Sequence, residues 1–190
     1  MKNNIIFVLS LVMFVYGYDL SFSFNIDIAS KVKVSTETAS TDSIYQSGDV
    51  WEANLVNGFS FALEGSQINS SMIYGVEYFA RTPVEDSISR TSLLSAYCAY
   101  PVFNFDNKIK FLAKFGYSIP TWDLEGDIVD WNGIGGLMYG ISSVFNDVIV
   151  QGNHLSIGVT FYKCSMEAVF EGLNLNSDLD YSRFTVGYIF

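Results

Sequence analysis

The sequence predicts an all-β fold, an eight-stranded antiparallel up-and-down barrel. Two observations lead to this prediction. Apolar residues recur at every second position in eight separate stretches, and the connections between the stretches alternate between long and short. A two-residue period is typical of a strand with one apolar face. With 190 residues, of which 49% are hydrophobic and 16% charged, the chain fits one folded domain and not a disordered polymer.

The predicted strands follow one another along the whole chain. In the first strand, apolar residues from Leu20 to Val34 alternate with polar residues, and the later strands repeat this pattern. The fourth strand has an ambiguous phase, because Leu93 and Leu94 compete for the same face. The strands are predicted at residues 20–34, 59–64, 72–81, 91–100, 109–116, 132–142, 154–165 and 182–190.

The lengths of the connections predict how the barrel is oriented. The longer ones are residues 35–56, 82–89, 118–131 and 166–180, and the short ones are residues 67–70, 102–107 and 145–148. In the predicted order, all the longer loops fall at one end of the barrel, and the short turns and both chain termini fall at the other. This is the plan of a bacterial outer-membrane barrel.

The first residues, 1–17, predict a secretory signal peptide. They contain a single cation, Lys2, followed by an apolar run from Ile5 to Tyr16 and small residues where a signal peptidase would cleave. The run is shorter than the about 20 residues that a membrane-spanning helix needs. An uncleaved anchor at the membrane surface is the alternative. The outer-membrane β-barrel domain is then predicted at residues 18–190.

Net charge and cysteine content exclude some classes of protein. A net charge of −10 argues against a nucleic-acid partner, which requires basic patches. The two cysteines, Cys98 and Cys164, are too few for a disulfide framework. We expect them on non-neighbouring strands as small apolar residues or free thiols, with one non-local bridge as the alternative. No cofactor is expected, and no metal site is predicted.

The direction of the apolar face separates a membrane barrel from a soluble one. A soluble lipocalin-like barrel also alternates, but turns its apolar face inward. Here the polar strand faces carry most of the cations among Gly and Ser, whereas most carboxylates lie in the predicted loops. Aromatic residues near strand ends fit the interfacial girdles of a membrane barrel; they are Tyr100, Tyr117, Trp131, Tyr181 and Tyr188. We therefore predict that the apolar face contacts lipid.

The charges on the polar faces predict a salt-bridge network that plugs the lumen, since eight strands enclose an interior just wide enough for side chains to fill. The predicted members are Asp27, Glu64, Glu77, Arg81, Lys110, Lys114 and Arg183. At mid-barrel, Glu77 and Asp27 are expected to pair with Lys114. Lys31 and Lys33 are expected in the lumen nearer the outer end. If the lumen opens, its excess of cations predicts a weak anion preference.

The chain ends with apolar and aromatic residues at alternating positions: Phe184, Val186, Tyr188 and Phe190. This pattern resembles the C-terminal signal of outer-membrane β-barrels, which the barrel-assembly machinery reads. With its eight strands and signal peptide, the chain from Tyr18 onward resembles the small family that includes OmpA, OmpX and the opacity-type adhesins. The resemblance implies a monomeric barrel in the bacterial outer membrane, with lipid and the assembly machinery as partners.

The acidic loops are the predicted site of any extracellular ligand, because loops on a rigid barrel carry binding functions. One of them could hold Ca²⁺ through Asp123, Glu125 and Asp127. Their spacing does not match an EF-hand loop. We therefore interpret these carboxylates as solvated charges.

The only histidine raises the alternative of an enzyme. His154 and Ser156 lie two residues apart on one strand face, with Glu167 and Glu171 beyond. These are the parts of a hydrolytic triad, and they slightly resemble the set of outer-membrane lipid A deacylases. However, Glu167 is an odd number of positions from His154 and would therefore lie on the opposite face of a regular strand. The sequence predicts a non-enzymatic barrel with a structural or adhesin-like surface role; a narrow channel is the first alternative, and a lipid A-modifying hydrolase the second.

Overall fold

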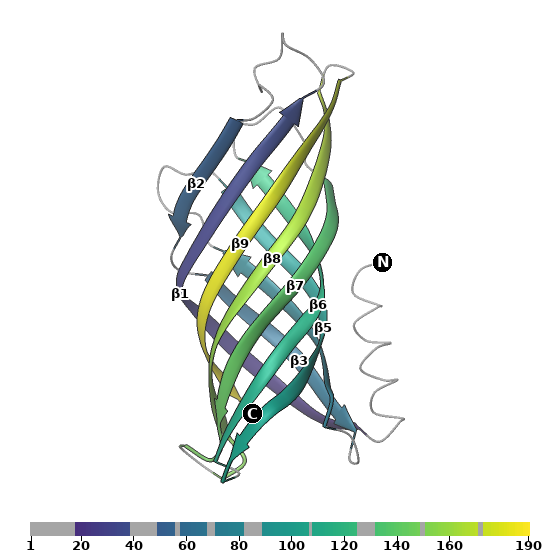
Figure 1. The fold of residues 1–190 in the computed structure, drawn as a ribbon. Coiled ribbons are helices and arrows are strands. Elements are labelled where there is room, and N and C mark those ends of the chain that lie inside the picture. The colour runs from purple at the N-terminus through teal and green to yellow at the C-terminus, as the bar shows by residue number, and fades with distance from the viewer. Residues whose placement is uncertain are drawn as a thin grey trace.

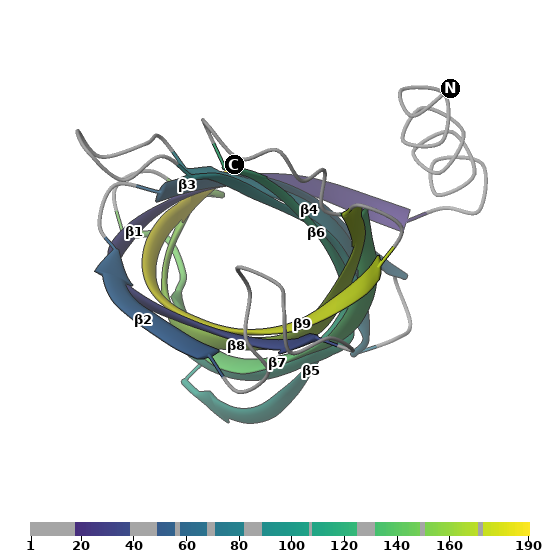
Figure 2. The same cartoon turned by 90° about the horizontal axis from the view of Figure 1, so that it is seen from above.

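The computed structural model describes residues 18–38, 49–55, 58–67, 71–81, 89–106, 108–124, 132–148, 151–170 and 173–190. Strands dominate these residues and form one closed ring (Figure 1, Figure 2). The prediction of an all-β barrel is confirmed. Within these ranges, no helix is long and apolar enough to cross a membrane. The predicted signal peptide, residues 1–17, lies outside them.

Neighbouring strands of the sheet run antiparallel. In chain order the strands are β1 (Tyr18–Thr38), β2 (Asp49–Leu55), β3 (Gly58–Gln67), β4 (Ile73–Arg81), β5 (Ser89–Phe105), β6 (Ile109–Leu124), β7 (Asn132–Phe145), β8 (His154–Phe170) and β9 (Leu173–Ile189). The hydrogen-bonded order is β2-β1-β3-β4-β5-β6-β7-β8-β9, and β1 also pairs with β9. The β1–β9 pairing closes the ring.

Two of these strands, β2 and β3, occupy a single position in the barrel. β1 pairs with β3 through Ile26 and Phe59, and with β2 through Ser30 and Leu55. Both pairs have the same register offset, so β2 continues the line of β3 alongside β1. The closed barrel therefore has eight strand positions, as the sequence predicts.

The strand ends that flank the predicted short turns lie at the same end of the barrel as the C-terminus, and β1, β2, β8 and β9 extend farthest at the opposite, outer end (Figure 1). Three segments predicted as long loops contribute to strands, and residues 118–124 of the predicted loop 118–131 belong to β6. Residues 35–56 contribute the end of β1 and all of β2, and residues 166–180 contribute to β8 and β9. In residues 166–180 the loop prediction was wrong because alternation continues with its apolar face reversed: Leu179 is buried inside, and Asp178 and Asp180 are exposed outside.

At the turn end and in the middle of the barrel, large apolar side chains point outward. Leu94 is 37% exposed while Leu93 is fully buried, which settles the phase of β5. Other exposed members of this surface are Phe22, Ile26, Tyr78, Phe111, Phe115, Ile141, Phe161 and Phe184. We call this surface the apolar belt. It matches the band that membrane barrels turn toward lipid.

Toward the outer end, the apolar side chains change to the inner face. On β8, the outward apolar run ends at Phe161, and beyond it Cys164 and Met166 are buried inside. On β9, Phe184 is exposed outside, whereas Leu179 is fully buried inside. An apolar interior with a polar exterior is the pattern of a barrel in water. The switch therefore marks the outer border of the apolar belt.

A bulge in β1 changes the direction of the residues beyond it. The register between β1 and β9 shifts between Asp27 and Ala29. Asp27 is buried inside the barrel, but Lys31 and Lys33 are exposed. The prediction that these lysines line the lumen is wrong, because a shift of one residue moves each following side chain to the other face.

Candidate functional site

Arg183 lies in the barrel interior and is the largest fully buried side chain among the described residues. It extends from β9 to Asp27 of β1 and Glu77 of β4. Its Nη2 and Nε donate to Asp27 Oδ1 at 2.7 and 2.9 Å, and its Nη1 donates to Glu77 Oε1 at 3.1 Å. The exposed fractions of Arg183, Asp27 and Glu77 are 1%, 3% and 6%. One guanidinium thus connects three strands across the lumen.

Neutral side chains complete the surroundings of Arg183. Its Nη2 donates to Ser60 Oγ and its Nη1 to the Tyr162 hydroxyl, both at 3.0 Å. Ser60 donates a further hydrogen bond to Glu77. The Phe79 ring centre lies 4.0 Å from Arg183 Cζ, in cation–π contact. Every guanidinium nitrogen therefore has an acceptor, which buried charges require.

A second polar cluster lies nearer the turn end of the lumen. Lys114 Nζ is 3.6 Å from Glu64 Oε1, and the Tyr97 hydroxyl donates to the same carboxylate oxygen. Lys114 Nζ also lies 4.8 Å from the centre of the Tyr97 ring. A Cβ at Gly75 would come within 2.5 Å of that ring. The small residue on β4 therefore leaves the space that Tyr97 occupies.

The predicted pairing of Lys114 with Glu77 and Asp27 is wrong. Glu64 of β3 pairs with Gly75 of β4, which pairs with Tyr97 of β5, which in turn pairs with Gly116 of β6. On the inner face of β6, Gly116 is next to Lys114. Lys114 is therefore level with Glu64, and Arg183 takes the place that was assigned to it. Counting residues along single strands ignores the stagger between neighbours, and in a tilted barrel this stagger decides which side chains meet.

The remaining predicted members of the network lie outside both clusters. Arg81, at the end of β4, is buried, and its Nε and Nη1 have no hydrogen-bond partner among the described residues. Lys110, at the turn end of β6, is half-buried on the inner face. Of the predicted network, five charges thus form two compact groups, and Arg81 and Lys110 belong to neither among the described residues.

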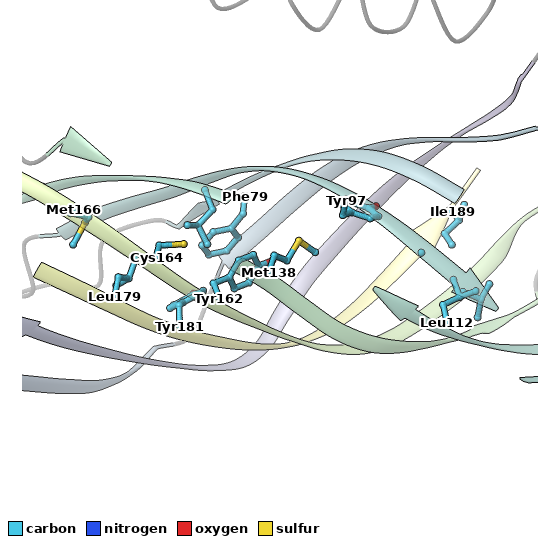
Figure 3. Close-up of a cluster of buried hydrophobic side chains, with 13 residues drawn as sticks. Phe79, Tyr97, Leu112, Met138, Tyr162, Cys164, Met166, Leu179, Tyr181 and Ile189 are labelled. Atoms are coloured by element: carbon cyan, nitrogen blue, oxygen red, sulfur yellow. The ribbon is translucent and has the colours of Figure 1, made fainter. Parts of the chain in front are cut away.

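Phe79 and Tyr162, which contact Arg183, belong to an apolar layer that continues toward the outer end with Tyr181, Leu179 and Met166 (Figure 3). The ring centres of Phe79 and Tyr181 lie 5.5 Å apart, and those of Tyr162 and Tyr181 lie 6.0 Å apart. Met138 and Leu179 are fully buried in the same cluster. At this level the described side chains fill the interior with aromatic and aliphatic groups.

Sequence reasoning missed this layer because residues 166–180 were assigned to a loop. A signal was present, since Leu179 and Tyr181 alternate with Asp178 and Asp180. Read with its apolar face inward, the segment is a strand in contact with water outside.

Three residues of the predicted C-terminal signal lie on the outer face of β9, and the fourth, Phe190, follows its last residue. Phe184 and Phe190 are exposed, and Val186 and Tyr188 are half-buried. The Phe190 N–H donates to the Phe22 carbonyl at 2.8 Å, and the two rings lie 6.3 Å apart. The end of the chain therefore forms part of the β1–β9 seam. Its recognition by the assembly machinery stays a prediction.

The structure does not bring the candidate hydrolytic residues together. His154 and Ser156 lie at the turn end of β8, where Ser156 Oγ donates to Asn25 Oδ1 at 3.4 Å. Glu167 is exposed on the outer face near the other end of this strand, roughly 40 Å away at the rise of an extended chain. Glu171 lies outside the described residues.

The described residues contain no group of three or more His, Cys, Asp or Glu placed to hold a metal ion. The candidate calcium residues Glu125 and Asp127, and the side chain of Asp123, lie outside the described part. Cys98 and Cys164 are free thiols on non-neighbouring strands. Cys98 lies on the outer face of β5, and Cys164 is buried inside.

Known proteins resemble this chain in structure. No protein-family model and no curated protein matches its sequence. The crystal structure of Neisserial surface protein A (NspA) is similar, with a TM-score of 0.51 and 15% identity over 91% of this chain and 97% of that chain. The solid-state NMR structure of outer membrane protein AlkL in DMPC lipid bilayers has a TM-score of 0.50 and 13% identity, over 92% of this chain and 90% of that one.

A third structure, Ail, the attachment invasion locus protein of Yersinia pestis, matches at a TM-score of 0.36 and 9% identity, covering 87% of this chain and 97% of that chain. This match is too distant to carry an argument. The first two show that the fold is that of small eight-stranded outer-membrane barrels, and the predicted resemblance to this class is confirmed. At these identities the likeness concerns the fold alone.

Replacing the central cation is predicted to destabilise the barrel. Arg183→Met leaves Asp27 and Glu77 buried without a countercharge, and we expect the free energy of unfolding to fall by about 3–5 kcal/mol. The triple variant Arg183→Met, Asp27→Asn, Glu77→Gln removes all three charges and is expected to regain most of this loss. Urea unfolding of the barrel in phosphatidylcholine vesicles measures both.

The matched control for this experiment is the exposed ion pair in which Lys163 Nζ lies 3.8 Å from Asp180 Oδ1. Asp180→Asn is expected to change the free energy of unfolding by less than about 1 kcal/mol, because water screens an exposed pair. An equally small effect for Arg183→Met would contradict the central role of the buried cluster.

Proposed function

We propose that the chain is a bacterial outer-membrane protein with a closed lumen and a structural or adhesin-like surface role. The apolar belt supports this placement, since a soluble surface rarely exposes so large an apolar area. The two proteins that share the fold are named a surface protein and an outer membrane protein. Export by residues 1–17, assembly through the C-terminal signal and a monomeric state belong to the same proposal.

The observation that carries the proposal is the nearly complete burial of large side chains in the barrel interior. Arg183, Phe79, Tyr162 and Tyr181 are all almost completely buried at the level where the ionic cluster meets the apolar layer. A weakly anion-preferring channel would have to separate Arg183 from both of its carboxylates. The closed barrel is favoured over the channel for this reason, and over a hydrolase because His154 and Ser156 lie far from Glu167 along β8.

The surface role is supported by the outer end of the barrel. β8 and β9 continue past the apolar belt as a hairpin, with Glu167 and Asp178 exposed on its outer face. These carboxylates add to the acidic loops predicted at the same end. An extracellular partner that carries positive charge would be attracted by this surface.

The closed lumen predicts a low conductance. The purified barrel in a planar lipid bilayer is expected to give no steady single-channel current under conditions in which an open porin conducts. The reason is that the ionic cluster and the apolar layer are almost completely buried in an interior that eight strands make just wide enough for side chains. Steady unitary currents with a preference for anions would support the channel alternative instead.

The surface role predicts that adhesion depends on the outer hairpin. Glu167 and Asp178 are exposed carboxylates of this hairpin, so the double variant Glu167→Gln, Asp178→Asn removes their charge without changing the strand register. Bacteria producing the full chain are expected to adhere to cultured cells more than bacteria producing this variant. Heat-dependent mobility in SDS gels checks that both barrels are folded. Equal adhesion by both strains and by bacteria lacking the chain would contradict the adhesin-like role.

A further inference from the structure

Arg81 is a second arginine buried inside the barrel, and its surroundings differ from those of Arg183. It is the last residue of β4 and faces inward, two positions beyond Phe79 toward the outer end. Its exposed fraction is 5%, close to the 1% of Arg183. Every guanidinium nitrogen of Arg183 has an acceptor, whereas Nε and Nη1 of Arg81 are enclosed without a hydrogen-bond partner among the described residues. The two arginines are thus similarly buried, but they are not similarly satisfied.

The carboxylates of the lumen are directed away from Arg81. Asp27 and Glu77 both bond to Arg183. Because inner residues recur at every second position of a strand, Phe79 lies between Glu77 and Arg81 on the inner face of β4. The exposed carboxylates of the β8–β9 hairpin lie on its outer face. Among the described residues, no carboxylate is therefore placed to accept a hydrogen bond from Nε or Nη1 of Arg81.

The apolar layer continues beside Arg81 toward the outer end of the lumen (Figure 3). Tyr181, which packs on Phe79, lies close enough to Arg81 to interact with it electrostatically. A buried guanidinium among apolar side chains is costly unless an acceptor satisfies it. This position therefore favours an acceptor that carries negative charge. The buried apolar residues beyond the level of Tyr181 are Cys164, Met166 and Leu179.

We propose that Arg81 binds the carboxylate of a small organic acid with an apolar body, at the outer end of the lumen. A guanidinium presents its donors in a planar fork that matches the two oxygens of a carboxylate. The apolar body of the acid would pack against Met166 and Leu179. The flexible stem of an arginine allows the guanidinium to turn toward the acid. The inference rests on the proposed closed lumen and adds a ligand to it, because the acid binds above the Arg183 cluster without passing it.

The test titrates hexanoate into the mature chain in phosphatidylcholine nanodiscs and measures the heat of binding. Nanodiscs without protein give the background. We expect saturable binding to the unmodified chain, and an affinity at least about tenfold lower for Arg81→Met, because this variant loses the charge-assisted hydrogen bonds. 1-Hexanol, which has the same apolar body and no carboxylate, is expected to bind equally weakly to both chains.

Two further variants serve as matched controls. Lys110→Met removes another inner-face cation, at the turn end of β6, and should bind hexanoate as the unmodified chain does. Arg81→Lys keeps the charge without the planar fork and should recover part of the affinity that Arg81→Met loses. The absence of saturable hexanoate binding, or an equal loss of affinity in Lys110→Met and Arg81→Met, would overturn the proposal.

Urea unfolding without hexanoate separates this site from a salt bridge within the chain. If a carboxylate of the chain itself satisfied Arg81, Arg81→Met would lower the urea midpoint. We expect instead that the ligand-free variant unfolds at the same or a higher urea concentration, and that hexanoate raises the midpoint only when Arg81 is present. A lower midpoint in the ligand-free variant, with no effect of hexanoate on either chain, would refute the site.

The failure of the proposed function gives a different result. Steady single-channel currents from the unmodified barrel would contradict the closed lumen, whatever the effect of Arg81 on hexanoate binding. A closed barrel that binds hexanoate independently of Arg81 would refute only the site. The heat-dependent shift in SDS gel mobility checks that each variant is folded, and Arg81→Lys provides the comparison should Arg81→Met fold poorly.

Discussion

The contact of Arg183 with Asp27 and Glu77 is the interaction on which the barrel interior depends. A ring of eight strands leaves space for side chains and little else, so a charge placed inside must find its partners inside. Arg183 meets this requirement from the last strand, and its carboxylates come from β1 and β4. The same contact therefore neutralises the lumen, links strands distant in sequence and blocks the path of an ion.

The environment outside the barrel determines which face of each strand is apolar. Below the border, the surroundings favour apolar residues outside and polar residues inside, as with Phe161 and Thr160 on β8. Above it, the preference reverses, and Leu179 is buried inside while Asp180 is exposed outside. The two halves of the molecule thus follow opposite rules in one continuous sheet.

Much of the fold could be predicted from alternation alone, because a period of two identifies a strand in either surrounding. The inward positions of Asp27, Glu77 and Arg183 followed from the same pattern. The facing of Lys31 could not be predicted, because the bulge before it arises from pairing with β9 and leaves no mark in the local pattern. The partner of Lys114 was misassigned because stagger between strands is a property of the closed ring.

The β8–β9 hairpin shows a different kind of failure. The strand pattern of its outer part is present in the sequence, but its apolar face is the inner one. We assigned this segment to a loop because we expected every strand to turn its apolar face outward, as lipid-exposed strands do. Applying both rules to each segment would have found the strand, and with it the buried layer of Leu179 and Tyr181.

The central claim is that the outer face of the barrel meets lipid up to a definite border and water beyond it. Ile141 and Val169 test it most directly, because they are 66% and 68% exposed on the same outer surface, below and above that border. In phosphatidylcholine vesicles, Ile141→Arg is expected to lower the free energy of unfolding by about 2–4 kcal/mol, whereas Val169→Arg should change it by less than about 1 kcal/mol. Equal, small effects of both substitutions would contradict the account, since they would place both positions in water.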